Sequence, residues 1–225
     1  MKLDARLSAV ASLVRQGSVV ADIGTDHAYL PAYLVQQGIC PRAIASDLRS
    51  GPLNNARTTI DACGLSDRID TLLSDGLDAL TPGCCDDVVL AGMGGLLIVE
   101  LISRTPWLKD PAVRVIAQPM RHAADVRRFF FENGFALKEE VCAADSKHCY
   151  CAMAAEYTGS PVAYTPAQPY VGLLPTIGTP AAARLLQTQF LQLKKRRDAL
   201  LLTGDPNGEA AVLTAVLNDF PNVEG

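Results

Sequence analysis

Acidic residues stand at the ends of several short apolar runs in this chain. Asp22 and Asp26 belong to the stretch SVVADIGTDHAYLP at residues 18–31, Asp47 ends the next apolar run, and Asp75 ends the one after it. If these runs are neighbouring parallel strands, their carboxyl ends meet at one edge of a sheet, where such folds bind ligands. Carboxylates gathered there can hold a cationic group and accept hydrogen bonds from sugar hydroxyls.

The stretch at residues 18–31 predicts a buried strand that turns into a helix. Residues 19–23 are apolar apart from Asp22, Gly24 interrupts them, and a helix is expected to begin near Ala28 and to end at Gly38. The unit resembles a dinucleotide-binding fingerprint that keeps only the first glycine, because Asp26 stands where the second is expected.

The carboxylate of Asp26 argues against a dinucleotide. It would repel a pyrophosphate, whereas Asp22 and Asp26 together suit the sulfonium and ammonium groups of S-adenosylmethionine. The alternative role for Asp26 is that of a helix N-cap, which is compatible with ligand contact.

Composition limits the class of protein. The 225 residues are 49% hydrophobic and 20% charged, with a net charge of −4, which is ordinary for a soluble globular protein of one or two domains. We expect no membrane span and no signal peptide, because no long apolar run exists and the N-terminus MKLDARLSAV is interrupted by charges. Seven cysteines without a CxxC pair predict reduced thiols in a cytoplasmic protein, with no metal site. No protein partner is evident.

Helical and strand patterns alternate along the chain. Helices are expected over residues 3–14, 28–37, 53–62, 96–102 and 123–132, and strands over residues 19–23, 42–47, 69–75, 87–91, 114–118, 135–141 and 150–157. A closing hairpin in place of a last helix predicts an α/β, doubly wound sheet with one antiparallel strand. This count is similar to the Rossmann-like, seven-stranded fold of class I S-adenosylmethionine-dependent methyltransferases.

The predicted strand ends supply the candidate cofactor contacts. Asp47, followed by Leu48, lies 25 positions after Asp22, close to the spacing of a carboxylate that binds ribose hydroxyls. Methyltransferases commonly place an acidic residue near the adenine at the position of Asp75-Gly76, and the substrate usually approaches at Ala91–Gly95. The alternatives are a helix N-cap for Asp47, a simple turn at Asp75-Gly76 and a tight turn at residues 92–95.

A set of motifs in fixed order makes a closer resemblance. The set comprises LDARLSAVASLV at residues 3–14, ADIGTDHAYLP at 21–31, SD at 46–47, SDGL at 74–77, AGMGG at 91–95 and AQPM at 117–120. Together they resemble the bacterial tRNA (adenine-22, N1)-methyltransferase family over residues 1 to about 157. The resemblance implies methylation of N1 of adenine 22, in the D-arm region of tRNA, with S-adenosylmethionine. The implied cofactor-binding residues are Asp22, Gly24, Asp26, His27, Asp47, Leu48, Asp75, Gly76, Ala91 and Gly92.

The reaction asks little of acid–base residues. The lone pair of adenine N1 attacks the methyl group directly, so the enzyme must align the reactants and stabilise developing charge. Asp26 and His27 are the candidate catalytic residues, as acceptors from the exocyclic amine, although each can instead hold the cofactor or the loop. Tyr29 and Met93 are candidates to contact an extruded base, and helix packing is the alternative for Tyr29.

The C-terminal part of the chain is expected to contact tRNA. We predict a methyltransferase domain over residues 1–158, a Pro- and Gly-rich connector over 159–180 and a coiled-coil-like helical hairpin over 181–225, as the resemblance also implies. The basic tetrad Lys194, Lys195, Arg196 and Arg197 is a candidate phosphate contact, with a solvated helix face as the alternative. Arg121, Arg127 and Arg128 are expected to extend the basic surface.

Two other functions remain open at this point. One is a methyltransferase that acts on another RNA, a protein or a small molecule, and the other is a non-catalytic module that binds S-adenosylmethionine. An NAD-dependent dehydrogenase is disfavoured by Asp26.

Overall fold

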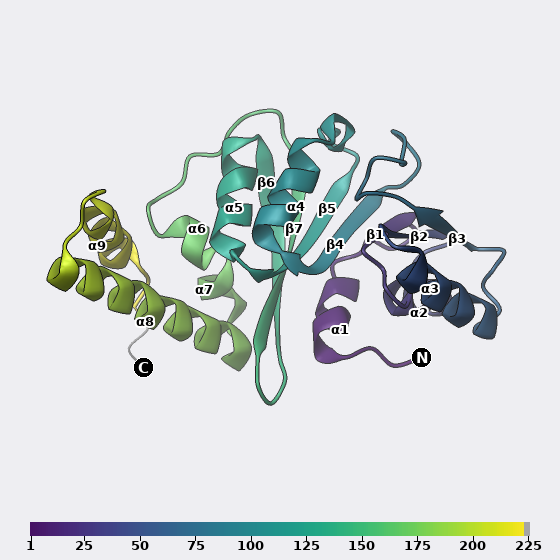
Figure 1. Cartoon of the computed structure of the whole chain (residues 1–225), viewed down its shortest axis with the longest axis horizontal. Helices are drawn as coiled ribbons and strands as arrows, with labels where there is room; N and C mark the ends of the chain where they lie inside the picture. Colours follow the sequence, from purple (N-terminus) through teal and green to yellow (C-terminus); the bar gives the residue numbers. More distant parts are fainter. Residues whose placement is uncertain (223–225) are drawn as a thin grey trace.

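One seven-stranded sheet forms the centre of the molecule (Figure 1). The computed structural model describes residues 1–222. The strand order is β3-β2-β1-β4-β5-β7-β6, and β7 runs antiparallel to both of its neighbours. The strands are β1 (Val20–Ile23), β2 (Ala43–Asp47), β3 (Ile69–Leu73), β4 (Asp87–Gly94), β5 (Arg114–Arg121), β6 (Phe135–Ala144) and β7 (Cys149–Tyr157). The predicted α/β sheet with one antiparallel strand is confirmed.

Helices cover both faces of this sheet because its central strands are apolar on both sides. Val20 and Val89 pack into a core with α1 (Ala5–Ala11), α2 (Tyr29–Gln36) and α3 (Ser50–Ala62). Ala21 and Leu90 point the other way, into a core with α4 (Gly95–Ser103) and α5 (Ala123–Glu132). Alternate residues of a strand face opposite sides of a sheet, so an unbroken apolar run predicts this double cover. A 3-10 turn, η1 (Pro106–Leu108), follows α4.

The Gly-rich segment after residue 91 continues the strand, so the tight turn that was the alternative for residues 92–95 is wrong. Strand β4 continues to Gly94 with irregular pairing around Met93, and α4 begins at once at Gly95. A Cβ on Gly95 would lie 2.5 Å from the carbonyl oxygen of His122 and 2.7 Å from that of Arg121. The glycine therefore lets the start of α4 approach the end of β5, which keeps the two strand ends side by side.

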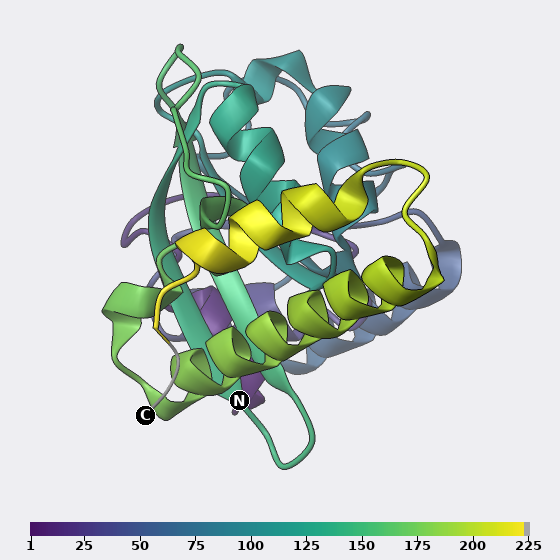
Figure 2. The same cartoon turned by 90° about the vertical axis from the view of Figure 1, so that its left-hand side faces the viewer.

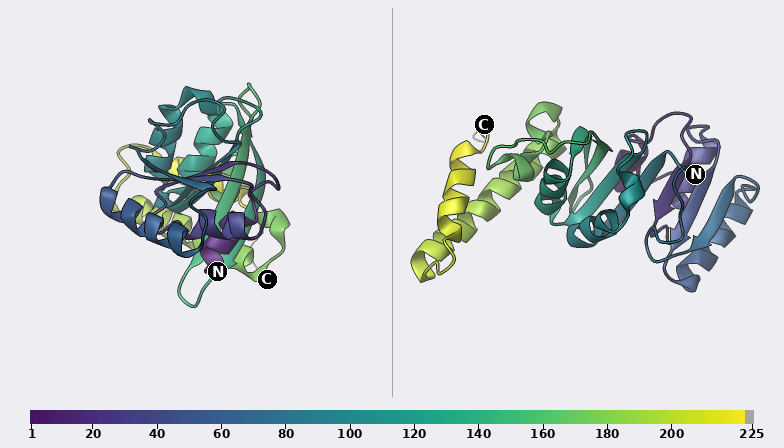
Figure 3. Two further views of the ribbon diagram at one scale, coloured as in Figure 1. Left: turned by 90° about the vertical axis from the view of Figure 1, so that its right-hand side faces the viewer. Right: turned by 90° about the horizontal axis from the view of Figure 1, so that it is seen from above.

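The C-terminal helices form a third apolar cluster at the β6 end of the sheet. Helices α8 (Pro180–Thr203) and α9 (Glu209–Asp219) run side by side across that end (Figures 2 and 3). Two short helices, α6 (Gln168–Val171) and α7 (Leu174–Ile177), form within the Pro- and Gly-rich residues 159–180. The cluster joins the hairpin to β7 and the short helices through Leu186, Leu193, Leu213, Val216, Cys151, Val171 and Leu174. The predicted end of the hairpin, at residues 223–225, lies outside the described residues.

A buried ion pair fastens this region to the sheet. Arg127 is 2% exposed, and its Nε donates to Oε1 of Glu140 on β6 at 2.7 Å. The same guanidinium donates to the carbonyls of Pro169 and Tyr170 at 3.1 and 3.3 Å, and the amide of Leu173 donates to Glu140 at 2.5 Å. The prediction that Arg127 extends a basic surface is therefore wrong, because its side of α5 faces β6 and α6. Arg128 is half-buried and pairs with Asp125 at 3.0 Å.

No helix in the described part of the chain combines the length and the apolar character that a membrane crossing requires.

We expect Arg127→Met to lower the free energy of unfolding by about 3–5 kcal/mol, because it leaves the Glu140 carboxylate buried without a cation. Urea denaturation measures this change, and amide hydrogen exchange should rise most at residues 168–177. The exposed Arg184→Met on α8 is the matched control, expected to change stability by about 0.5 kcal/mol or less. Adding Glu140→Gln to Arg127→Met should restore part of the loss. Equal urea midpoints for Arg127→Met and Arg184→Met would contradict the conclusion that the buried pair of Arg127 and Glu140 stabilises this region.

Candidate functional site

A cavity of about 260 Å³ opens at the carboxyl ends of β1 and β4. Its walls come from the start of α1, the turn between β1 and α2, and the end of β4. It brings together the predicted residues Asp22, Gly24, Asp26, His27, Tyr29 and Ala91, and it adds Asp4, Arg6, Leu7, Thr25 and Leu30. This is the edge of the sheet at which a doubly wound fold binds its ligand.

Asp22 gives the cavity a buried carboxylate. Its Oδ2 accepts a hydrogen bond from the Thr25 hydroxyl at 2.7 Å, and the residue is 6% exposed. Burial raises the pKa of Asp22 to about 6; the carboxylate of Asp47 adds to the rise, and the Thr25 hydrogen bond and the Arg6 charge oppose it. A partly compensated anion in a cavity favours a ligand that carries positive charge.

The turn from β1 into α2 is held in an uncommon backbone conformation. Gly24, Asp26 and Ala28 all have φ between 50° and 76°, in the left-handed region that disfavours residues other than glycine. The amides of Gly24 and Thr25 both donate to the carbonyl of Ser46, at 2.8 and 2.9 Å, which ties the turn to β2. Ala28 is the N-cap residue of α2, and no side chain caps that helix. The N-cap alternative for Asp26 is therefore wrong, and its side chain, 63% exposed, lines the cavity.

Two rings form an exposed surface at the mouth of the cavity. The rings of His27 and Tyr29 stack with centroids 5.2 Å apart and an angle of 8° between their planes. Nε2 of His27 lies 3.6 Å from Oδ2 of Asp26. Tyr29 is 46% exposed, so helix packing does not account for this side chain. Met93 does not line the cavity: it is half-buried against the core on the α4 and α5 side of the sheet, and its Cε would lie 3.1 Å from a Cβ on Gly24.

Arg6 is a site residue that the sequence analysis missed. Its Nη1 donates to Oε1 of Gln118 at 3.1 Å, and the amide of Gly92 donates to the same oxygen at 3.1 Å. A Cβ on Gly92 would lie 3.1 Å from Nη1 of Arg6, so the guanidinium covers the backbone of Gly92. The signal available in the sequence was the position of Arg6 inside the motif LDARLSAVASLV. The helix predicted over residues 3–14 was identified from its apolar residues alone, and its charged residues were given no role.

The ends of β2 and β3 contribute differently. Asp47 is buried, and its Oδ1 accepts from the amide of Arg49 at 2.9 Å. Arg49 is the N-cap residue of α3, so the N-cap alternative for Asp47 is wrong. Leu48 beside it is 61% exposed, a flat apolar surface at the same edge. The carboxylate of Asp75 instead pairs at 2.6 Å with Arg104, the C-cap residue of α4, and Gly76 lies against Leu101 of α4.

The basic tetrad is divided by its ion pairs. Arg196 pairs with Glu209 of α9 at 2.6 Å, and Arg197 pairs with its neighbour Asp198. Lys194 and Lys195 are exposed on α8. Arg121 is exposed at the end of β5, on the side of the sheet edge that faces α8.

This donor set fits S-adenosylmethionine. Asp22 suits the cationic groups, the Asp47 carboxylate can accept from ribose hydroxyls, and the Arg6 guanidinium can bind a carboxylate. Within residues 1–222, no three His, Cys, Asp or Glu side chains gather in a way that could hold a metal ion.

The sheet order and the place of the site define the class I S-adenosylmethionine-dependent methyltransferases, and residues 3–153 match the family model described as a methyltransferase domain. The chain is 35% identical over 164 residues to the tRNA (adenine(22)-N(1))-methyltransferase of Bacillus subtilis, covering 73% of this chain and 69% of that protein. It therefore belongs to the bacterial tRNA (adenine-22, N1)-methyltransferase family, as the motifs predicted.

Solved structures agree over the whole chain. The Bacillus subtilis m1A22 tRNA methyltransferase superposes with a TM-score of 0.83 at 27% identity, covering 97% of this chain and 96% of that one. A Streptococcus pneumoniae protein solved in complex with S-adenosyl-L-methionine superposes with a TM-score of 0.81 at 28% identity, covering 96% of this chain and 100% of that one. The C-terminal helices are thus part of the shared fold.

We expect the affinity for S-adenosylmethionine to fall as the pH drops through about 6, because protonation of Asp22 removes the negative charge that a cationic ligand favours. Below that pH the dissociation constant should rise about tenfold per unit, as for a single titrating group. Titration calorimetry between pH 5 and 8 measures this, with Asp22→Asn as the comparison, since the variant keeps the Thr25 partner but cannot ionise. Identical pH profiles for the two proteins would show that Asp22 is not the group involved.

Proposed function

We propose that this protein transfers a methyl group from S-adenosylmethionine to N1 of adenine 22 in the D-arm region of bacterial tRNA. The observation that carries the assignment is the 35% identity to the Bacillus subtilis enzyme over 164 residues, which is 73% of this chain. Since tRNA is modified in the cytoplasm, we place the protein there.

The cofactor is held from three strand ends. Asp22 faces its cationic groups, Asp47 and Leu48 receive the nucleoside, and Arg6 binds its carboxylate. Gly24 allows close approach of the turn, Ala91 lines the cavity, and Gly92 lies against the Arg6 guanidinium. The bound cofactor supplies an activated methyl group on a sulfonium. Asp75 and Gly76 support the adenine end indirectly, since Asp75 fixes Arg104 and the end of β3.

The target base is received at the mouth of the cavity. N1 lies on the Watson–Crick edge, so adenine 22 must leave its stacked position to react. The stacked rings of His27 and Tyr29 offer a surface for an extruded base, and base–aromatic stacking is worth about 1–3 kcal/mol. Asp26 and His27 lie where they can accept a hydrogen bond from the exocyclic amine, which becomes more acidic as the ring gains positive charge.

The remaining parts of the chain bind the RNA. Residues 1–158 form the methyltransferase unit, residues 159–180 connect it, and residues 181–225 hold tRNA. Lys194 and Lys195 attract phosphates, while Arg196 and Arg197 are already engaged by Glu209 and Asp198. Arg121 contributes a further cation beside the catalytic mouth. The alternative is the same chemistry on another RNA, a protein or a small molecule, or cofactor binding without catalysis.

Unmodified bacterial tRNA transcripts incubated with labelled S-adenosylmethionine should acquire 1-methyladenosine, detected by nucleoside mass spectrometry. The signal should disappear when adenine 22 is replaced by guanine, because guanine N1 carries a proton. Incorporation that survives this replacement would move the target to another position. Cofactor binding without incorporation would favour the non-catalytic alternative.

Replacing Lys194 and Lys195 by alanine should weaken tRNA binding and reduce the magnitude of the slope of log K against log salt concentration by about 1.5. A protein that has lost two cations neutralises fewer phosphates and therefore releases fewer counterions when it binds. Filter binding at several salt concentrations measures the slope. Replacing Arg184, exposed earlier on the same helix, by alanine is the comparison. An unchanged slope in the double variant would mean that the lysines belong to a solvated helix face.

A further inference from the structure

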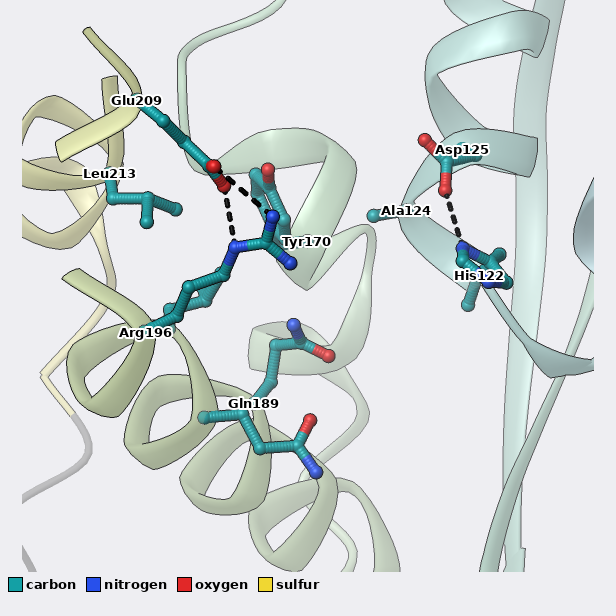
Figure 4. A pocket seen from close by; sticks show the side chains of 11 residues that line it. His122, Ala124, Asp125, Tyr170, Gln189, Arg196, Glu209 and Leu213 are labelled. Atoms are coloured by element: carbon teal, nitrogen blue, oxygen red, sulfur yellow. Dashed lines mark hydrogen bonds and ion pairs between the residues drawn. The ribbon is translucent and has the colours of Figure 1, made fainter. Parts of the chain in front are cut away.

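Two cavities adjoin each other between the methyltransferase sheet and the C-terminal helices. Their volumes are about 410 and 470 Å³, and they share His122, Ala123, Gln189 and Gln192. Because four residues line both, the cavities are two parts of one groove. Figure 4 shows the part that Arg196 and Glu209 border on one side and His122 and Asp125 on the other.

The groove begins beside the catalytic mouth. One end is lined by Pro119, Met120 and Arg121, at the carboxyl end of β5. Pro119 pairs with Met93, and Arg121 pairs with Gly94. Gln118, one residue earlier, accepts from Arg6 of the cofactor cavity. The cofactor cavity and the groove are therefore joined through the paired ends of β4 and β5.

One stripe of α8 forms the opposite wall. Thr188, Gln192 and Arg196 follow each other at intervals of four, and Gln189 lies beside them. Residues at this spacing share one helix face. Two amides and a guanidinium on this face can donate to phosphate and ribose oxygens, whereas the Thr188 hydroxyl donates to the carbonyl of Arg184 at 2.7 Å and can only accept. Of the basic tetrad, Arg196 alone lines the groove.

Carboxylates keep the net charge of the groove low. Glu209 holds Arg196 at 2.6 Å, and Asp125 holds Nδ1 of His122 at 3.1 Å. Arg121 is the exposed cation at the end near the mouth. Along α8, the paired charges and neutral donors position a backbone through hydrogen bonds, with little of the salt-dependent attraction that unpaired lysines provide.

We propose that this groove holds the sugar–phosphate backbone of the nucleotides that flank the target adenine, with Gln189 and Gln192 as the donors that set its register. The proposal rests on the proposed function, because it takes tRNA as the substrate. Extruding a base draws its neighbours toward the enzyme surface, and the groove leads away from the mouth with polar side chains of α8 along one wall. Lys194 and Lys195 of α8 then attract the tRNA phosphates, and the groove positions the backbone of the nucleotides beside the target adenine.

Gln192→Glu and Gln187→Glu form a charge-matched pair that tests the proposal. Both residues are exposed on α8, but Gln187 lines neither cavity. Each variant adds one negative charge to the same helix with almost no change of shape. We expect Gln192→Glu to lower kcat/KM for tRNA about tenfold, since a carboxylate replaces a donor to phosphate, and Gln187→Glu to change it by about twofold or less.

A second pair of changes keeps the test decisive if the glutamate variant folds poorly. Gln192→Lys should strengthen tRNA binding more than Gln187→Lys does. The double variant Gln189→Ala, Gln192→Ala should lose at least about fivefold in kcat/KM with an unchanged salt slope, because neutral side chains release no counterions. Calorimetry with S-adenosylmethionine should give the wild-type dissociation constant for every variant.

Equal kcat/KM values for Gln192→Glu and Gln187→Glu, or a wild-type value for the double alanine variant, would overturn the proposal and leave the groove to another partner. Failure of the proposed function is a separate result, because the wild-type protein would then form no 1-methyladenosine at position 22.

Discussion

The carboxylate of Asp22 is the constraint around which the site is built. Placing an anion at the end of a fully buried strand costs free energy unless partners compensate it, and the structure supplies only the Thr25 hydroxyl and the field of Arg6. The raised pKa of Asp22 is the sign that compensation is incomplete. A cationic ligand supplies the missing compensation for the Asp22 charge, and the cavity therefore selects ligands that carry positive charge. The strained turn at residues 24–28 is part of the same arrangement, because its two amides bond to Ser46 rather than to Asp22.

Gln118 joins this site to the rest of the molecule. Its side chain is 1% exposed and accepts from Arg6 and Gly92 through one oxygen, while its amide nitrogen donates to the carbonyl of Pro119 at 3.2 Å. Three elements therefore meet at a single buried amide: α1, the end of β4 and the end of β5. Because burial makes an unmet donor or acceptor costly, a shift of α1 would disturb the floor of the cofactor cavity. The N-terminal helix is in this way a structural wall of the site.

The sequence predicted the features that depend on local pattern. Apolar runs such as residues 87–91 located the strands, and the acidic residues after them located the ligand edge, since strand direction fixes which ends meet. Contacts between distant segments were beyond it. Arg6 reaches Gln118 across 112 positions, and nothing near Arg127 indicates that Glu140 and two carbonyls surround it. Asp75 is an acidic residue at the end of a strand, as predicted, but the orientation of its side chain depends on the hydrogen bond from Arg104, 29 positions later. The Gly-rich residues 92–95 misled for a physical reason: glycine there permits two strand ends and a helix start to approach closely, and no turn is needed.

The end of β5 lies between two surfaces, the cofactor cavity and the groove beside α8, which differ in the interactions that they offer to a ligand. Toward β4, Gln118 belongs to a cavity where a buried carboxylate and a covering guanidinium select a small charged ligand. Toward α8, residues 119–122 open into a groove in which His122 and Arg196 are paired with carboxylates, so that along α8 directional hydrogen bonds outweigh attraction at a distance. The close approach at Gly95 holds these two surfaces together, because it fixes the end of β5 against the start of α4. The buried pair of Arg127 and Glu140 does the same for the far wall, through the short helices that precede α8. Buried contacts at both walls thereby fix the spacing between the cofactor cavity and the groove that we propose for the RNA backbone.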